Sequence, residues 1–393
     1  MVALGFVLIF KASGVFNFAQ GAMVLFAALT FVLLLEAGPA GDFWGWTGWL
    51  SVPLAAVAGA IYVLSRRTGL IKPGRWLNRA VLALVLVAVA VLGGIFGEEV
   101  AMWRAIFVTL LVFLVLVVGV NFSQGAAAIL LGLAVVALVP SGLGLGGAAG
   151  EAMNFWRSLA VTMMVMIVLA MAIERMVLRP LINQEHIILF MVTIGLNFIL
   201  EGVAQGVWDA DVHALEIGIP DVPIQALSES TGIFVSTFDL FAAGMAAFLV
   251  GVLAVVFQKT RIGRALRAVA DDHQGALAVG IALQHIWAVV WSVAGIVALV
   301  AGVLWGSKLG VQFSLSLIVL KALPVLILGG FTSVPGAIVG GLIVGATEKL
   351  VEVFIGIPFL GGGTESWMPY MLALVFLLFR PQGLFGEEII ERV

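Results

Sequence analysis

Long apolar runs separated by short polar connections make up most of the sequence. Most runs approach the length of about 20 residues that an α-helix needs to cross the hydrocarbon core of a bilayer. Hydrophobic residues are continuous within the runs, whereas the strands of a transmembrane barrel would alternate apolar and polar positions. The pattern therefore predicts an all-α, polytopic transmembrane helical bundle with about 12–13 spans. The predicted spans lie near residues 17–35, 46–64, 79–97, 103–120, 124–147, 155–174, 187–207, 237–257, 285–306, 315–331, 336–355 and 367–380.

Residues 1–10 form a further apolar stretch that is too short to cross a bilayer by itself. We expect that the first helix is either cut short at Met1 or enters the membrane only partway. The stretch has neither the basic segment nor the small-residue cleavage site of a signal peptide, so none is expected.

The composition excludes a soluble globular enzyme. Hydrophobic residues make up 63% of the chain and charged residues only 10%, against about 25% in an ordinary soluble domain. A net charge of −3 without a basic face or tail argues against a nucleic-acid partner. Cysteine is absent and the four histidines have no zinc-like spacing, so we expect no metal site and no cofactor.

The Lys and Arg residues between the spans predict the orientation of the chain. The connections 65–79 and 258–273 are basic, and Arg380 follows the last span. The alternate connections are acidic, and the longest of them, 208–236, contains no Lys or Arg. Because basic loops stay on the cytoplasmic side of a membrane, we expect the C-terminus to be cytoplasmic. The acidic loop is either a docking surface for an external partner or a solvated loop that obeys the same charge rule.

One short block occurs twice. Asn17-Phe-Ala-Gln-Gly-Ala recurs as Asn121-Phe-Ser-Gln-Gly-Ala. Both copies stand at the predicted cytoplasmic start of a span. A parallel duplication within the membrane domain would explain the repeat, but six residues are too few to establish one.

No glycine motif in the chain predicts nucleotide binding. Gly142, Gly144 and Gly147 spell G-x-G-x-x-G, but they end an apolar span and do not join a strand to a helix, so coincidence is the better interpretation. No P-loop sequence occurs, and ATP would have to act through a partner. Glycines four residues apart between 329 and 345 indicate close helix packing instead.

A few ionisable residues fall inside predicted spans, where each is a functional candidate. Lys321 lies near the centre of the 315–331 span and should face a partner helix, a carboxylate or a watery path. Glu348 and Glu352 lie one turn apart toward the outer end of the next span. Either these groups form a proton relay, or their nearness to the interface keeps the carboxylates hydrated.

A polar stretch between two spans, residues 259–273, has the periodicity of a short amphipathic helix. It places Arg264, Arg267 and Asp271 on one face, and the last two are spaced as an i, i+4 ion pair. The opposite, apolar stripe consists of Ile262, Leu266 and Val269. The periodicity alone leaves two interpretations open, a plain interfacial anchor and a surface for a cytoplasmic partner.

Five blocks of sequence occur together in one order along the chain. They are Gly14-Val-Phe-Asn-Phe-Ala-Gln-Gly-Ala, Glu174-Arg with Arg179-Pro-Leu and Thr193-Ile-Gly-Leu, Thr260-Arg-Ile-Gly-Arg-Ala-Leu-Arg-Ala-Val-Ala-Asp with Gly280, Leu328-Gly-Gly-Phe-Thr-Ser-Val-Pro-Gly-Ala, and Arg380-Pro-Gln-Gly-Leu-Phe-Gly. Together the blocks resemble the branched-chain amino acid ABC transporter permease family, and most of all the first of its two permease subunits. The resemblance brackets residues 1–36 and 155–390.

The resemblance implies three parts. Residues 1–36 would be N-terminal permease helices, 37–154 an insertion of extra transmembrane helices, and 155–393 the permease core with a cytoplasmic coupling segment at 258–281. The insertion leaves open which copy of the repeated block, Asn17 or Asn121, occupies the family's position.

The implied function is that of a transmembrane permease subunit of an ATP-binding-cassette importer in the inner (plasma) membrane of a bacterium. Its partners would be a second permease subunit, cytoplasmic ATP-binding subunits and an external solute-binding protein, in contact with membrane lipid. ATP hydrolysis is expected in the partners, so the chain itself would not be an enzyme. The solute would be a branched-chain amino acid or a related small polar molecule such as urea or an amide, and the sequence does not decide among them.

Two groups of residues follow as site candidates. The coupling contacts with the ATP-binding subunits would come from Thr260, Gly263, Arg264, Arg267, Asp271 and Gly280. The solute path needs polar groups in an apolar tunnel, and its candidates are Asn17, Gln20, Gly21, Thr193, Asn197 and Lys321.

The alternative function is a stand-alone, ion-coupled secondary transporter. It would use Lys321, Glu348 and Glu352 as coupling groups and would work without ATP or partners. An intramembrane enzyme is disfavoured because the sequence offers no plausible nucleophile–base pair and no paired metal ligands.

Overall fold

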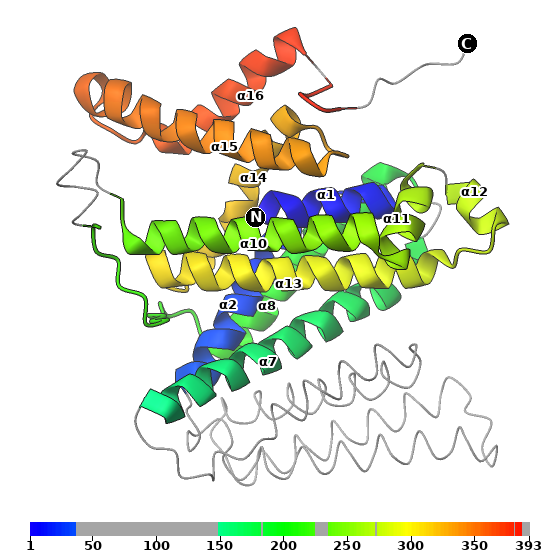
Figure 1. Ribbon diagram of the computed structural model, residues 1–393, viewed down its shortest axis with the longest axis horizontal. Helices are drawn as coiled ribbons and strands as arrows, with labels where there is room; N and C mark the ends of the chain where they lie inside the picture. Colours follow the sequence, from blue (N-terminus) through cyan, green and yellow to red (C-terminus); the bar gives the residue numbers. More distant parts are fainter. Residues whose placement is uncertain (37–147, 182–183, 225–234, 272, 381, 387–393) are drawn as a thin grey trace. The chain divides into compact units, whose positions relative to one another are not determined.

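The computed structural model describes residues 1–36, 148–181, 184–224, 235–271, 273–380 and 382–386, and these fold into helices (Figure 1). The helices are α1 (Val2–Ser13), α2 (Gln20–Glu36), α7 (Ala148–Ala172), α8 (His186–Trp208), α10 (Thr237–Lys259), α11 (Arg261–Asp271), α12 (His273–Ala278), α13 (Leu283–Leu309), α14 (Ile318–Gly329), α15 (Val334–Val351) and α16 (Met368–Phe379). Shorter π- or 3-10-helical segments are η3 (Ile173–Leu178), η4 (Arg179–Leu181), η5 (Phe313–Leu317), η6 (Glu352–Leu360) and η7 (Thr364–Ser366). The described part of the chain has no strand beyond two isolated bridges, so the predicted all-α class is confirmed.

Several described helices are long and apolar enough to cross a membrane. They are Ser158–Leu181, Ile187–Trp208, Thr237–Lys259 and His285–Leu309. Phe313–Gly329 and Val334–Leu360 are joined by a bend of 115°, and shorter apolar helices cover Val2–Ser13, Gln20–Leu35 and Met368–Phe379. The predicted multi-pass bundle is thereby confirmed. The spans predicted near 46–64, 79–97, 103–120 and 124–147 lie outside the described residues.

The chain divides into two compact units. The first comprises residues 1–25, 174–200 and 212–393, and the second comprises residues 26–173 and 201–211. Two pairs of aromatic rings are in contact within the second unit. The ring centroids of Phe26 and Trp208 are 4.6 Å apart, and those of Phe31 and Phe155 are 5.5 Å apart. All the candidate path and coupling residues lie in the first unit.

α1 lies along α13 inside the first unit. Nearly all its side chains are apolar and buried, as expected of a helix that is hydrophobic around its whole circumference. The indole N–H of Trp287 in α13 donates to the carbonyl of Ala12 at 3.0 Å. α1 ends at Gly14, whose left-handed backbone (φ 66°) turns the chain toward α2.

Glycines allow α14 and α15 to approach closely where they join. A Cβ on Gly329 would lie 2.2 Å from the carbonyl oxygen of Gly336, and a Cβ on Gly336 would lie 2.0 Å from that of Gly329. Ser333 caps α15 by accepting a hydrogen bond from the N–H of Gly336 at 3.0 Å. These contacts show the predicted close packing at Gly329 and Gly336, the part of the series where α14 and α15 join.

The segment after α16 returns to this junction. The N–H of Leu384 donates to the carbonyl of Leu328, near the end of α14, at 2.8 Å. Gly330 and Gly383 have φ values of 98° and 82°, and a Cβ on Gly383 would lie 2.8 Å from the backbone nitrogen of Gly330. Two of the sequence blocks, some fifty residues apart, therefore meet through their backbones.

Candidate functional site

The connection between α1 and α2, residues 14–19, leads into a buried pair of side-chain amides. Asn17 and Gln20 are both 0% exposed. Asn17 Nδ2 donates to Gln20 Oε1 at 3.1 Å, and Gln20 Nε2 donates to the backbone carbonyl of Ala294 at 3.2 Å. These bonds anchor the polar start of α2 to the middle of α13.

Gly21 sets the spacing between α2 and the segment before α14. A Cβ at this position would lie 2.1 Å from the carbonyl oxygen of Ser316 and 2.9 Å from the Cβ of Val319. A larger residue would therefore force α2 away from η5. Gly21, one of the candidate path residues, is therefore needed for the close approach of α2 to η5.

Thr193 in α8 holds the same connection in place. Its hydroxyl oxygen accepts a hydrogen bond from the N–H of Phe18 at 3.2 Å, and its proton is shared between the carbonyls of Phe16 and Phe190, at 3.0 and 2.8 Å. Because these backbone groups occupy the hydroxyl, Thr193 positions the connection. Asn197, one turn further along α8, is also buried.

A cluster of phenylalanine rings surrounds the connection. Ring centroids within it lie between 5.0 and 6.2 Å apart. Its members are Phe6 and Phe10 of α1, Phe16 and Phe18 of the connection, Phe190 of α8 and Phe331 between α14 and α15. The cluster was not predicted from the sequence, although the alternation Phe-Asn-Phe at 16–18 was a signal. Alternate side chains of an extended segment point in opposite directions.

The predicted amphipathic helix is α11, which begins at a tight turn after α10. The hydroxyl of Thr260 accepts a hydrogen bond from the N–H of Gly263 at 3.0 Å. A Cβ on Gly263 would lie 2.2 Å from the carbonyl oxygen of Phe257, so a glycine is needed there. Gly280, after α12, has a φ of 84°, which also favours glycine. Thr260, Gly263 and Gly280 therefore shape the backbone of the coupling segment.

The apolar stripe of α11 is shorter than predicted. Leu266 and Val269 are buried, with 2% and 0% exposure, but Ile262 is 45% exposed. α11 is in contact with α10, α1 and α13. Only the later part of the helix is therefore fastened to the bundle.

The two central arginines of α11 have different surroundings. Arg264 is exposed. Arg267 turns back, and its Nη1 donates to the carbonyl of Phe257, near the end of α10, at 2.5 Å. Asp271 is the last residue of α11. Both arginine side chains are exposed, but Arg267 is also bonded to the backbone at the turn between α10 and α11.

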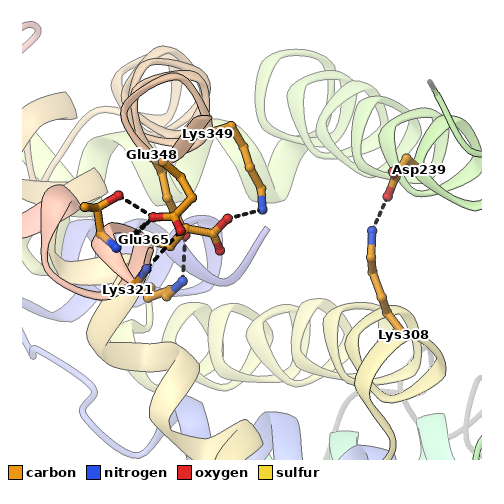
Figure 2. Close-up of polar contacts among 9 residues, drawn as sticks. Asp239, Lys308, Lys321, Glu348, Lys349 and Glu365 are labelled. Carbon is orange, nitrogen blue, oxygen red and sulfur yellow. Dashed lines mark hydrogen bonds and ion pairs between the residues drawn. The ribbon is translucent and has the colours of Figure 1, made fainter. Parts of the chain in front are cut away.

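Charged side chains pair with one another around α14 and α15 (Figure 2). Lys321 Nζ lies 2.7 Å from Glu348 Oε1, and Lys349 Nζ lies 2.5 Å from Glu365 Oε1. Of the surroundings expected for Lys321, a carboxylate is the one found. The Lys321 side chain is 41% exposed, and its bond is to Glu348, so the structure does not bring it together with the amides of Asn17 and Gln20.

The carboxylate of Glu352 organises the loop that follows η6. Its oxygens accept hydrogen bonds from the N–H of Gly363 at 2.9 Å, the N–H of Thr364 at 2.7 Å, the Thr364 hydroxyl and the N–H of Glu365 at 3.2 Å. The glycines at 361–363 all have positive φ, which lets successive N–H groups converge on an anion. Both carboxylates suggested for ion coupling therefore have partners within the chain.

Comparison with known proteins adds to this geometry. Residues 100–380 match the model of the family described as branched-chain amino acid transport system / permease component. The chain belongs to this family. The match covers α11, the α14–α15 junction and the charged pairs around it. It begins inside the expected insertion, so it includes the Asn121 copy of the repeated block and leaves out the Asn17 copy.

This permease has relatives in several organisms. It is 28% identical over 225 residues to the high-affinity branched-chain amino acid transport system permease protein BraD of Pseudomonas aeruginosa, covering 56% of this chain and 71% of BraD. It is 28% identical over 233 residues to LivH of Escherichia coli K12, with the same coverage. A probable LivH of Methanocaldococcus jannaschii is 28% identical over 224 residues, covering 55% of this chain and 70% of that protein. No solved structure matches the chain.

Proposed function

We propose that this permease is the transmembrane subunit of an ABC importer in a bacterial inner membrane, and that it carries branched-chain amino acids or related small polar solutes such as urea and amides. The observation that carries the proposal is family membership together with an exposed arginine on a helix fastened to the bundle. A second permease subunit, two cytoplasmic ATP-binding subunits and an external solute-binding protein would complete the importer.

α11 is the element through which ATP would act. Leu266 and Val269 are buried and α11 is in contact with α1 and α13, while Arg264 is exposed and would meet an acidic groove on an ATP-binding subunit. A movement of α11 would reach α1 directly, and α1 continues into the connection that carries Asn17. ATP binding would then bias a pre-existing equilibrium between outward- and inward-open states.

The solute path would run past the buried amides at the start of α2. Asn17 and Gln20 supply polar groups within an apolar surround, and Thr193 and Gly21 hold them there. Residues 1–36 and 155–393 would form the permease core, with 37–154 as an insertion.

The solute-binding protein would dock near the acidic connection 208–236. Backbone hydrogen bonds pair His213 with Val311, at 3.0 and 2.8 Å, so the described part of this connection is held beside the end of α13. An ion pair between Asp239 and Lys308 ties the start of α10 to the same end of α13 (Figure 2). A fixed surface of this kind suits repeated docking of an external protein.

The coupling role is tested by co-purification with the ATP-binding subunits from mild detergent. We expect wild type to retain these subunits and Arg264→Glu to lose them by about tenfold or more, because the change places a carboxylate against an acidic groove. Lys259→Glu is the matched control, since it makes the same charge change just outside α11 and should retain them.

Two results would contradict the proposal. One is equal retention of the ATP-binding subunits by Arg264→Glu and wild type. The other is solute uptake by the chain alone in proteoliposomes, with an ion gradient and no ATP-binding subunit. The second result would support the ion-coupled transporter, with Lys321, Glu348 and Glu352 as its coupling groups.

A further inference from the structure

Among the buried polar atoms that lack a hydrogen-bond partner in the described residues, two belong to the segments that the Gln20–Ala294 hydrogen bond joins, the start of α2 and the middle of α13. One is an acceptor, the Oδ1 of Asn17, and the other is a donor, the Nε1 of Trp291 in α13. Both side chains are 0% exposed. Buried polar atoms are paired in the great majority of cases, so an unpaired donor and an unpaired acceptor at one junction need a physical reason.

The junction is that of α1, α2 and α13. Trp291 lies one turn before Ala294, whose carbonyl accepts the hydrogen bond from Gln20. Trp287 lies one turn earlier again and donates its own indole N–H to Ala12 of α1. Residues three and four apart share one face of a helix. These two tryptophans and Ala294 therefore line the face of α13 that meets α1 and the start of α2.

We propose that Asn17 Oδ1 and Trp291 Nε1 form a polar subsite of the solute path. The amide oxygen accepts an N–H from the solute's ammonium or amide group, and the indole N–H donates to its carboxylate or carbonyl oxygen. The subsite takes small solutes that carry a donor and an acceptor close together, as α-amino acids, urea and short amides do. This inference rests on the proposed function and adds Trp291 to the path.

The neighbouring rings favour a solute that is partly apolar. Phe16 and Phe18 flank Asn17 in the chain, and their ring centroids lie 5.0 Å from Phe6 and 6.1 Å from Phe190, respectively. Aromatic faces offer a large apolar surface to an aliphatic side chain. An amino acid with such a side chain would use both the polar atoms and the rings, whereas urea would use only the polar atoms.

The experiment compares two tryptophans on one face of α13. The indole N–H of Trp287 donates to the carbonyl of Ala12, whereas that of Trp291 has no partner among the described residues. The complex of this chain with its partner permease and ATP-binding subunits is purified as wild type, Trp291→Phe and Trp287→Phe. Its melting temperature is measured with and without leucine in the absence of solute-binding protein, so that a leucine-dependent rise reports binding to the membrane subunits. Uptake of radiolabelled leucine, urea and acetamide into proteoliposomes is then measured with the solute-binding protein present.

We expect Trp291→Phe to keep the unliganded melting temperature, to lose the leucine-dependent rise and to lower leucine uptake about tenfold, the effect of one lost hydrogen bond to a charged group. Trp287→Phe should lower the unliganded melting temperature, because the bond to Ala12 is lost, and should keep the leucine-dependent rise. If wild type takes up urea or acetamide instead of leucine, the same comparison is made with that solute and the same differences are expected.

The proposal is overturned if Trp291→Phe binds and transports the solute as wild type does. It is also overturned if both variants lose melting temperature and uptake in parallel, as two purely structural tryptophans would. A wild-type complex that takes up none of the three solutes would refute both the proposed function and this subsite. Wild-type uptake that Trp291→Phe leaves unchanged would refute the subsite alone.

Discussion

Arg264 and Arg267 lie one turn apart on α11 and would look equivalent on a helical wheel. Arg267 donates to the carbonyl of Phe257, which α10 would otherwise leave open at its end. Arg264 extends into solvent. The two residues therefore differ: Arg267 ties α11 back to the end of α10, whereas Arg264 is the residue that we propose for the contact with an ATP-binding subunit.

This contrast predicts different effects for the same substitution. Arg267→Gln should loosen the turn and speed chymotrypsin cleavage after Phe257 about threefold or more, because local opening becomes easier. Arg264→Gln should leave the cleavage rate unchanged and weaken retention of the ATP-binding subunits. Limited proteolysis of the purified protein in detergent measures the first effect. Equal cleavage rates for the two variants would show that Arg267 does not hold the turn.

Sequence alone could place polar residues but could not assign their roles. The periodicity of 259–273 predicted a polar face, but a long guanidinium side chain can reach solvent or fold back onto a carbonyl from the same helix position. Thr193 and Asn17 were both candidates because they are polar in apolar surroundings. Their contacts separate them, since the Thr193 hydroxyl is occupied by the backbone and Asn17 Oδ1 is not.

At the scale of whole elements, the glycines of α15 differ in what they face. Gly336 lies against the carbonyl of Gly329, whereas a Cβ on Gly345 would meet no atom within 4 Å. The glycine at the start of α15 therefore belongs to a tight junction with α14, whereas the glycine further along the helix has open space beside it.

Gly336→Ala is accordingly expected to destabilise the protein, and Gly345→Ala is not. The added methyl group at 336 would lie 2.0 Å from a backbone oxygen, an overpacking that costs about 1–3 kcal/mol. The same group at 345 is free of contacts and improves helix propensity by about 0.5–1 kcal/mol. Melting temperatures in detergent should fall by roughly 2–10 °C for the first variant and stay level or rise for the second. A similar loss for both would contradict the tight junction.

The sequence predicted the helices better than it predicted the contacts between them. Apolar runs of helical length identified the described spans because the requirement to pair every backbone group in lipid leaves few alternatives. The backbone bond between Leu384 and Leu328 has no local signal, since it joins segments far apart in sequence. The pairing of Lys321 with Glu348 could be anticipated only as one of several options for a lysine inside a span.

The chain as a whole carries two copies of the Asn-Phe-x-Gln-Gly-Ala block, and only one can occupy a given junction. The family match, residues 100–380, includes the copy at Asn121. In the structure the copy at Asn17 is buried against α13, and its Gly21 touches Ser316 so closely that no second segment could share the position. The Asn121 copy lies outside the described residues. The family match therefore includes one copy, and the described junction contains the other.

Matched substitutions in the two copies decide which one the folded protein uses. Gly21→Val should abolish assembly and solute uptake, because its Cβ alone would lie 2.1 Å from a backbone oxygen. Gly125→Val, the same change in the second copy, should keep uptake and melting temperature within about twofold and a few degrees of wild type, because the first copy already occupies the junction. Both are measured on the purified complex in proteoliposomes. The reverse pattern would place the second copy at the junction and make the assignment of 37–154 as an insertion wrong. Equal loss in both would mean that the copies occupy equivalent junctions, as a true duplication of the membrane domain requires.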